Sequence, residues 1–154
     1  MKKSEWSIST KKAKKGGNPI SKKELKTYTK NFQKAVKNDE LSKNFKTEYG
    51  NREGEFFGCD RIEELLKAAN KAASIEGNEC VGIRFYYGLA YEEINAKKGT
   101  TKISTKPIKD KSMSPRLFMV GVDQNGADIE IGESQLKGTS GNGVGEGFPK
   151  PPFS

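Results

Sequence analysis

Histidine is absent from the 154 residues of the chain, and its absence restricts the chemistry open to the other side chains. Histidine is the usual general base near neutral pH and the commonest metal ligand in proteins. The two cysteines, Cys59 and Cys80, are too few for a disulfide framework and lack the spacing of metal ligands. We interpret both cysteines as reduced and buried, and we predict no catalytic residue, no metal site and no cofactor.

The acidic side chains do not form a convincing metal site. Three side chains of the calcium-binding type surround Gly126, namely Asp123, Asn125 and Asp128. The EF-hand spacing would place the first ligand at Gly121 and the closing glutamate at Gly132, so both positions fail. We interpret this sequence as a hairpin turn, and the side chains of the whole chain favour binding over catalysis.

The net charge of +8 is concentrated in lysine-rich segments, of which residues 1–18 and 96–116 are two. Lysine neutralises phosphates but lacks the planar fork with which arginine reads bases. These segments therefore indicate either a solvated surface or contact with a polyanion such as nucleic acid. The candidate contacts are Lys11, Lys12, Lys14, Lys15, Lys97, Lys98 and Lys102.

Composition divides the chain into three parts. Only 32% of the residues are hydrophobic, and many of the 17 glycines lie towards the two ends. We expect a basic flexible arm over residues 1–18, a single domain over 19–137 and a flexible Gly/Pro-rich tail over 138–154. No apolar run follows the basic start as in a signal peptide, and no stretch approaches the ~18 apolar residues of a spanning helix. We therefore expect a cytoplasmic protein without membrane insertion.

Two segments have the periodicity of amphipathic helices. Residues 20–38 begin with a capping box at Ser21 and then place an apolar side chain at every third or fourth position. A short continuation is expected within residues 40–48. The second helix is expected over residues 61–74, with Asp60 as its N-cap.

Alternating apolar residues predict the strands of a small sheet. Residues 80–89 are apolar at every odd position, so we expect the odd-numbered side chains to face the core. Residues 116–122 form the second strand, and an Asn-Gly turn leads into a third at 127–131. Residues 101–108 are either a marginal edge strand or part of a loop. The prediction is an α+β fold in which two or three N-terminal helices cover one face of a small antiparallel sheet, with flexible termini.

A few side chains are candidates for contact with a partner. Arg84 lies in mid-strand opposite the aliphatic positions, and it is either a surface cation along Tyr86 or a buried cation paired with Asp60 or a helix acid. A lone Trp in a basic arm can anchor an interface, and a Pro-rich tail flanked by two Phe can dock as polyproline II. The candidates are Trp6, Arg84, Tyr86, Phe148, Pro151 and Phe153.

Three segments together resemble a group of small cytosolic bacterial proteins. These segments are FFGCDRIEELLKAANKAA, CVGIRFYYGL and PRLFMVGVDQNGADI, and the second contains the distinctive Cys-x-Gly-Ile-Arg-x-Tyr-x-Gly strand motif. The likeness spans residues 56–131, which is roughly half of the chain. The resemblance implies no activity and assigns no functional residues.

We interpret the chain as a non-enzymatic protein-interaction module, a component or adaptor of a larger bacterial assembly. Its partner would be another protein or a second copy of the chain. The alternative is a nucleic-acid-binding protein that uses the lysine-rich arm and loop. The least favoured alternative is a cysteine-dependent enzyme that uses Cys59, because no histidine is present to deprotonate the thiol.

Overall fold

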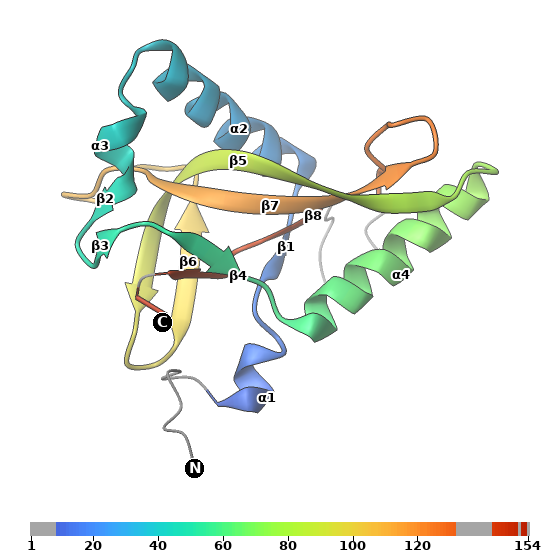
Figure 1. Ribbon diagram of the computed structural model, residues 1–154, viewed down its shortest axis with the longest axis horizontal. Coiled ribbons are helices and arrows are strands. Elements are labelled where there is room, and N and C mark those ends of the chain that lie inside the picture. The colour runs from blue at the N-terminus through green and yellow to red at the C-terminus, as the bar shows by residue number, and fades with distance from the viewer. Residues whose placement is uncertain (1–8, 132–142, 151, 154) are drawn as a thin grey trace.

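The computed structural model describes residues 9–131, 143–150 and 152–153 (Figure 1). Its helices are α1 (Thr10–Ala13), α2 (Lys22–Lys37), α3 (Leu41–Phe45) and α4 (Cys59–Ile75). Its strands are β1 (Asn18–Ile20), β2 (Lys46–Thr47), β3 (Gly50–Asn51), β4 (Gly54–Phe56), β5 (Cys80–Asn95), β6 (Thr100–Ser104), β7 (Ser114–Asp123), β8 (Gly143–Gly145) and β9 (Phe148–Lys150). The chain therefore has the predicted α+β fold.

A five-stranded antiparallel sheet in the order β1-β8-β7-β5-β6 forms the centre of the molecule. Its longest pairing joins β5 and β7, from Cys80 opposite Asp123 to Ala90 opposite Ser114. Beyond Ala90, β5 continues to Asn95 and pairs with β6, so the strand is longer than predicted and the possible edge strand exists. Two short antiparallel pairs, β2-β3 and β4-β9, lie beside this sheet.

Helix α2 forms where the sequence predicts it. The backbone N–H of Glu24 donates to Ser21 Oγ at 3.1 Å, and the backbone N–H of Ser21 donates to Glu24 Oε2 at 2.8 Å, so the capping box is confirmed. The helix buries Leu25 and Tyr28 against the sheet, and the Tyr28 ring stacks on Phe118 with centroids 5.0 Å apart.

Helix α4 begins earlier than predicted. Its N-cap is Gly58, so Asp60 is a residue of the first turn and not the cap. The segment that follows α1 helps to begin α4, because the backbone N–H of Asp60 donates to the carbonyl oxygen of Lys14 at 3.0 Å. Cys59, the first helical residue, is exposed and Cys80 is only partly buried, so the prediction that both cysteines are buried is wrong. Small residues bring the helix close to β7: a Cβ added at Gly121 would lie 2.6 Å from Ala69 Cβ.

The two long helices cover opposite faces of the sheet, which corrects the prediction of one covered face. Phe118 of β7 belongs to the same apolar cluster as Tyr28 of α2. Its neighbour Met119 belongs to the cluster of Leu65 in α4. Successive side chains of a strand point to opposite faces, so α2 and α4 lie on different sides of β7. Figure 1 shows the long strands running between the two helices.

The C-terminal segment completes the sheet, and its described part is not a flexible tail. Strand β8 lies between β1 and β7, and β9 pairs with β4. The glycines here permit close packing, because a Cβ at Gly145 would lie 2.8 Å from the Phe118 ring and 2.9 Å from Ile20. The Gly-rich sequence predicts a segment that cannot pack, whereas these glycines allow other side chains to pack against the backbone.

Two other boundaries also differ from the prediction. The arm predicted for residues 1–18 contains α1, the buried Gly16 and Gly17 and the first residue of β1, so at least its second half belongs to the domain. Residues 127–131 form only one isolated bridge, Val122 with Asp128, although Ile129 and Ile131 are buried. The third strand beside β7 is therefore β8 and not the segment that follows the turn.

Candidate functional site

Three of the odd-numbered side chains in the first half of β5 are exposed, contrary to the prediction, whereas Ile83 is partly buried against the core. The exposed fractions are 57% for Val81, 53% for Phe85 and 63% for Tyr87. The reason is that α4 packs over β7 and β8, where Leu65 and Ala69 contact Met119 and Val144. On this face of β5, Ile83 packs against the α4 cluster, and no other helix covers the rest of the face within the described part of the chain, so three large apolar side chains are left in solvent.

The same stretch of β5 presents unpaired backbone groups along one edge. The backbone N–H of Leu117 donates to Glu55 Oε2 at 2.6 Å, and the carbonyl of Gly121 accepts from the N–H of Ile129 at 2.9 Å. Both β7 residues therefore direct backbone groups away from β5. In an antiparallel pair the residues opposite them, Tyr87 and Ile83, must then direct their own N–H and C=O to the other edge of β5.

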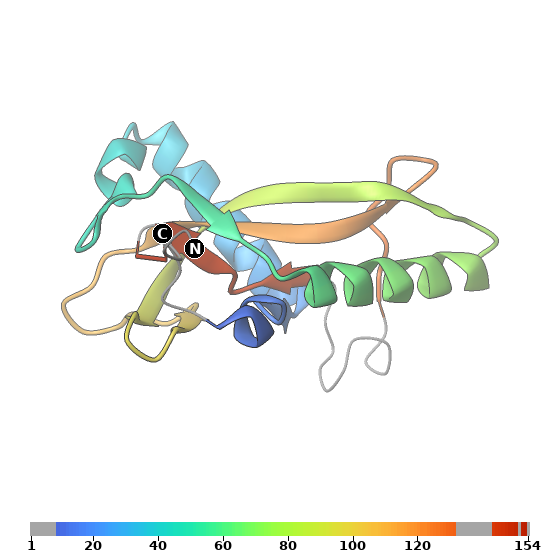
Figure 2. The same cartoon turned by 60° about the horizontal axis from the view of Figure 1, so that its bottom comes forward.

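This open edge is bounded on one side by α2. The carbonyl oxygen of Leu89, two residues beyond Tyr87, accepts from Asn31 Nδ2 at 3.3 Å, and from Tyr91 onward β6 occupies the edge. No described strand pairs with the edge before this point, and Figure 2 shows β5 along the rim of the molecule with β7 between it and α4. We call the residues Val81, Ile83, Phe85 and Tyr87, with the outward backbone groups of the last three, the β5 strip.

An apolar pocket of about 100 Å³ continues the β5 strip at its Tyr87 end. Phe45, Tyr87, Pro115 and Leu117 supply its apolar lining. Phe32 of α2 stacks on the Tyr87 ring, with the two ring centroids 5.4 Å apart. The strip thus combines an ordered aromatic, a pocket for an apolar side chain and an open strand edge.

Three residues that line this pocket belong to a cluster of four charged side chains, which the sequence did not reveal. Arg116 pairs with Glu55 and, at 3.1 Å, with Glu92, while Arg52 also pairs with Glu92. The exposed fraction of each of these side chains is below 10%. The Arg116 Nη2 group also donates to the carbonyl of Gly147 at 2.7 Å, so the cluster joins β4, β5, β7 and the C-terminal segment.

Burial sets the protonation of this cluster. Burial raises the pKa of Glu55, although the Arg116 charge and the Leu117 N–H both oppose the rise. Burial alone would lower the pKa of Arg116, but the carboxylates of Glu55 and Glu92 outweigh it and raise that pKa. Two cations and two carboxylates compensate each other, so this cluster holds the fold together and does not offer a free acid or base.

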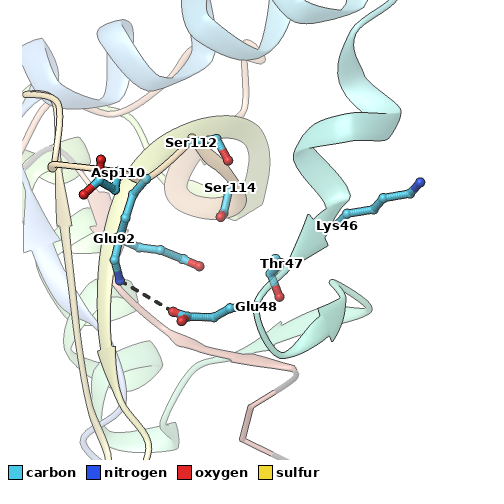
Figure 3. A pocket seen from close by; sticks show the side chains of 8 residues that line it. Lys46, Thr47, Glu48, Glu92, Asp110, Ser112 and Ser114 are labelled. Carbon is cyan, nitrogen blue, oxygen red and sulfur yellow. Dashed lines mark ion pairs between the residues drawn. The ribbon is translucent and has the colours of Figure 1, made fainter.

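A separate polar pocket of about 190 Å³ opens beside Glu92 (Figure 3). Lys111 and Glu48 form an ion pair across it at 3.5 Å, and Lys46 points away from its centre. The hydroxyls of Thr47, Ser112 and Ser114 also line the pocket. The Glu92 carboxylate already accepts from two guanidinium groups, so it is poorly placed to activate a hydroxyl.

Arg84 and Tyr86, predicted as partner contacts, are joined to each other through Asp128. Arg84 Nη1 lies 2.6 Å from Asp128 Oδ1, and the Tyr86 hydroxyl donates to the other oxygen of the same carboxylate. Burial, and after it the hydrogen bond to Asp128, raises the pKa of Tyr86. The predicted pairing with Asp60 or a helix acid is wrong, because the acid comes from the segment that follows β7.

The lysine-rich arm and loop, distant in sequence, meet in the structure. Lys12 Nζ donates to the carbonyl oxygen of Lys98. A pocket of about 290 Å³ lies at this junction, with Lys12, Lys15, Arg61 and the carboxylate of Glu146 in its lining. Lys12 and Lys15, two of the predicted polyanion contacts, thus line one pocket, and the backbone of a third, Lys98, accepts a hydrogen bond from Lys12.

The aromatic anchors predicted in the C-terminal segment are not available to a partner. Phe148 and Phe153 are buried, with exposed fractions of 6% and 2%, and their ring centroids lie 5.2 Å apart. They pack with Phe56 and Ile94, which contradicts their interpretation as docking side chains. The remaining two candidates, Trp6 and Pro151, lie outside the described residues.

In the part of the chain that the structure describes, no three metal-ligating side chains come together. Within the same residues, no helix is long and apolar enough to span a membrane. Comparison with protein-family models, curated proteins and solved structures finds no match. The functional argument therefore depends on the chemistry of the surfaces described above.

Proposed function

We propose that the chain is a protein-interaction module that binds an extended segment of a protein partner along the β5 strip. The observation that carries this proposal is that outward backbone groups at Ile83 and Tyr87 coincide with exposed apolar side chains at Phe85 and Tyr87 on the same stretch of β5. The proposal includes a cytoplasmic, non-enzymatic role as a component of a larger bacterial assembly.

Strand addition uses both features of the strip. The backbone groups of the edge would pair with those of the added segment, and alternate side chains of that segment would lie beside Phe85 and Tyr87. The apolar pocket next to Tyr87 would accept one further side chain. A partner segment is therefore expected to be extended, free of proline at its pairing positions and apolar at every second residue.

Selection from a phage-displayed library of random peptides tests this function. The immobilised protein is expected to enrich peptides with alternating apolar residues. A Tyr87→Lys variant should lose this enrichment, because a charge would replace the aromatic ring at the pocket. An Ile75→Lys variant is the matched control, since Ile75 is 73% exposed at the end of α4 and lies outside the strip. Absence of enrichment, or equal enrichment by wild type and Tyr87→Lys, would contradict the proposal.

Nucleic-acid binding is the second candidate, and the meeting of the lysine-rich arm and loop favours it. Binding of a labelled oligonucleotide should weaken with salt, with a slope of about −0.7 to −0.9 in log K against log salt for each phosphate neutralised. Replacing Lys12 and Lys15 together by Ala should weaken binding and reduce the slope. The same change at Lys23 and Lys26, exposed on α2, serves as the control. No binding at about 50 mM salt would remove this candidate.

A further inference from the structure

We infer that the segment bound along the β5 strip is the β5 strip of a second copy of the chain, so that the protein forms a two-fold symmetric dimer. This inference rests on the proposed function and names the partner. A two-fold dimer uses the same surface on both copies, and that surface must therefore be complementary to itself. The β5 strip meets this condition in its backbone, in its apolar side chains and in its charges.

The backbone of the strip is self-complementary because its outward groups all belong to odd-numbered residues. Hydrogen-bonded pairs in an antiparallel ladder form between residues that both point their N–H and C=O at the neighbouring strand. When two copies of β5 lie antiparallel, odd residues can face odd residues along the whole open stretch. Strand order across the dimer would then continue from β7 through the two copies of β5 to the second β7.

The length of the open edge selects one register. The stretch from Ile83 to Tyr87 is regular, because a bulge between Cys80 and Gly82 interrupts the pairing before it and α2 holds the carbonyl of Leu89 after it. Phe85 is the middle residue of this stretch, and a two-fold axis there aligns the two free stretches over their full length. In this register Phe85 faces Phe85 of the second copy, and Ile83 faces Tyr87 of the second copy.

The charges agree with this register. Arg84 lies on the opposite face of β5, and an axis at Phe85 places it beside the Tyr86 ring of the second copy and not beside a second Arg84. An arginine next to an aromatic ring is a favourable pair, whereas like charges directly opposite each other destabilise a sheet. Apolar side chains meet on one face and an Arg-Tyr pair forms on the other.

A charge-swap experiment tests the dimer and its axis together. Phe85 is 53% exposed, so Phe85→Lys and Phe85→Glu should both fold. Each variant alone should self-associate at least about a hundredfold more weakly than wild type, because like charges face each other across the axis. An equimolar mixture of the two variants should form a heterodimer. Sedimentation equilibrium of the 154-residue chain measures the self-association of each variant and of their mixture. The control is Ile75→Lys, which changes an exposed residue outside the strip and should leave self-association unchanged.

The outcomes separate this inference from the proposed function. A wild-type chain that stays monomeric at about 100 µM, a concentration that detects even weak dimers, overturns the dimer, and the peptide selection then decides separately whether the strip binds other proteins. A dimer that persists in Phe85→Lys shows that self-association uses a different surface. A dimer broken by both variants and not restored by mixing them overturns the axis at Phe85.

Discussion

The two halves of β5 belong to one strand but have opposite environments. Among the described strands, the first half, residues 80–87, pairs only with β7, and it exposes Val81, Phe85 and Tyr87 to solvent. The second half, residues 88–95, is covered by α2, β6 and the C-terminal segment, and it buries the charged Glu92. The same strand thus exposes the apolar side chain of Phe85 and buries the carboxylate of Glu92. The comparison teaches that the neighbours of a strand decide burial, and that the alternation of its own residues does not.

The largest effect is expected from Arg116 in the buried half. Arg116→Ala would leave the carboxylates of Glu55 and Glu92 without their shared cation, and we expect a loss of about 3–5 kcal/mol in the free energy of unfolding. Urea unfolding at neutral pH measures this loss. Arg84→Ala, the same change in the exposed half, should shift the midpoint very little. Similar losses for the two variants would contradict the contrast between the halves.

The next comparison concerns two apolar residues of β5. Leu89 is fully buried, so Leu89→Ala should cost about 2–5 kcal/mol through the lost contacts and the cavity left behind. Phe85→Ala should cost less than about 1 kcal/mol, because the ring is half exposed in the monomer. Both values come from unfolding measured at a protein concentration low enough for the chain to be monomeric. Equal costs would mean that the first half is covered in solution as well.

Glycine substitutions sharpen the same contrast with a smaller effect. A Cβ at Gly88 would lie 2.5 Å from the Phe118 ring and 2.9 Å from Tyr28, whereas a Cβ at Gly82 would meet nothing within 4 Å. Gly88→Ala should therefore cost about 1–3 kcal/mol through overpacking. Gly82→Ala should be neutral within the error of thermal unfolding. A neutral Gly88→Ala would show that α2 packs less closely on β5 than the structure indicates.

The smallest effect is a pH dependence at Glu146, which accepts from the N–H of Ile103 in β6. Burial raises the pKa of Glu146 above its ordinary value of 4.5, although that hydrogen bond opposes the rise. The folded protein therefore binds this proton more tightly than the unfolded chain. The resulting stabilisation is complete below about pH 4.5 and is lost as the pH rises through the folded value.

Glu146→Gln keeps an acceptor for Ile103 and removes the titration. The variant should therefore gain melting temperature relative to wild type between about pH 4 and pH 7. Glu130→Gln is the control, because Glu130 is exposed and pairs only with Lys22 among the described contacts. A constant difference between Glu146→Gln and wild type across this range would rule out the raised pKa.

Local signals in the sequence predicted local structure well. The capping box at Ser21 and the spacing of the apolar residues located α2, and the alternation of residues 80–89 identified a strand. Each of these patterns depends on residues a few positions apart, whose geometry is fixed by the backbone itself. The α+β class followed from the same patterns.

Contacts between distant segments account for what the sequence did not predict. The alternation in β5 does not indicate how far α4 will cover the strand, so the sequence predicts a core position for side chains that the β5 strip exposes. The buried charges come from four places in the chain, Arg52, Glu55, Glu92 and Arg116, and no spacing connects them. The glycines of β8 resembled those of a linker, because their close neighbours Phe118 and Ile20 are far away in sequence.

The position of β8 also determines when the protein can fold during synthesis. Strand β1 pairs with β8 and with no other described strand, so residues near the start of the chain obtain their ladder hydrogen bonds only from residues 143–145. Translation adds these residues long after β1. The ribosome must therefore synthesise the chain through β8 before the sheet closes, and a nascent chain that stops short of β8 leaves Ile20 and Phe118 without their covering backbone.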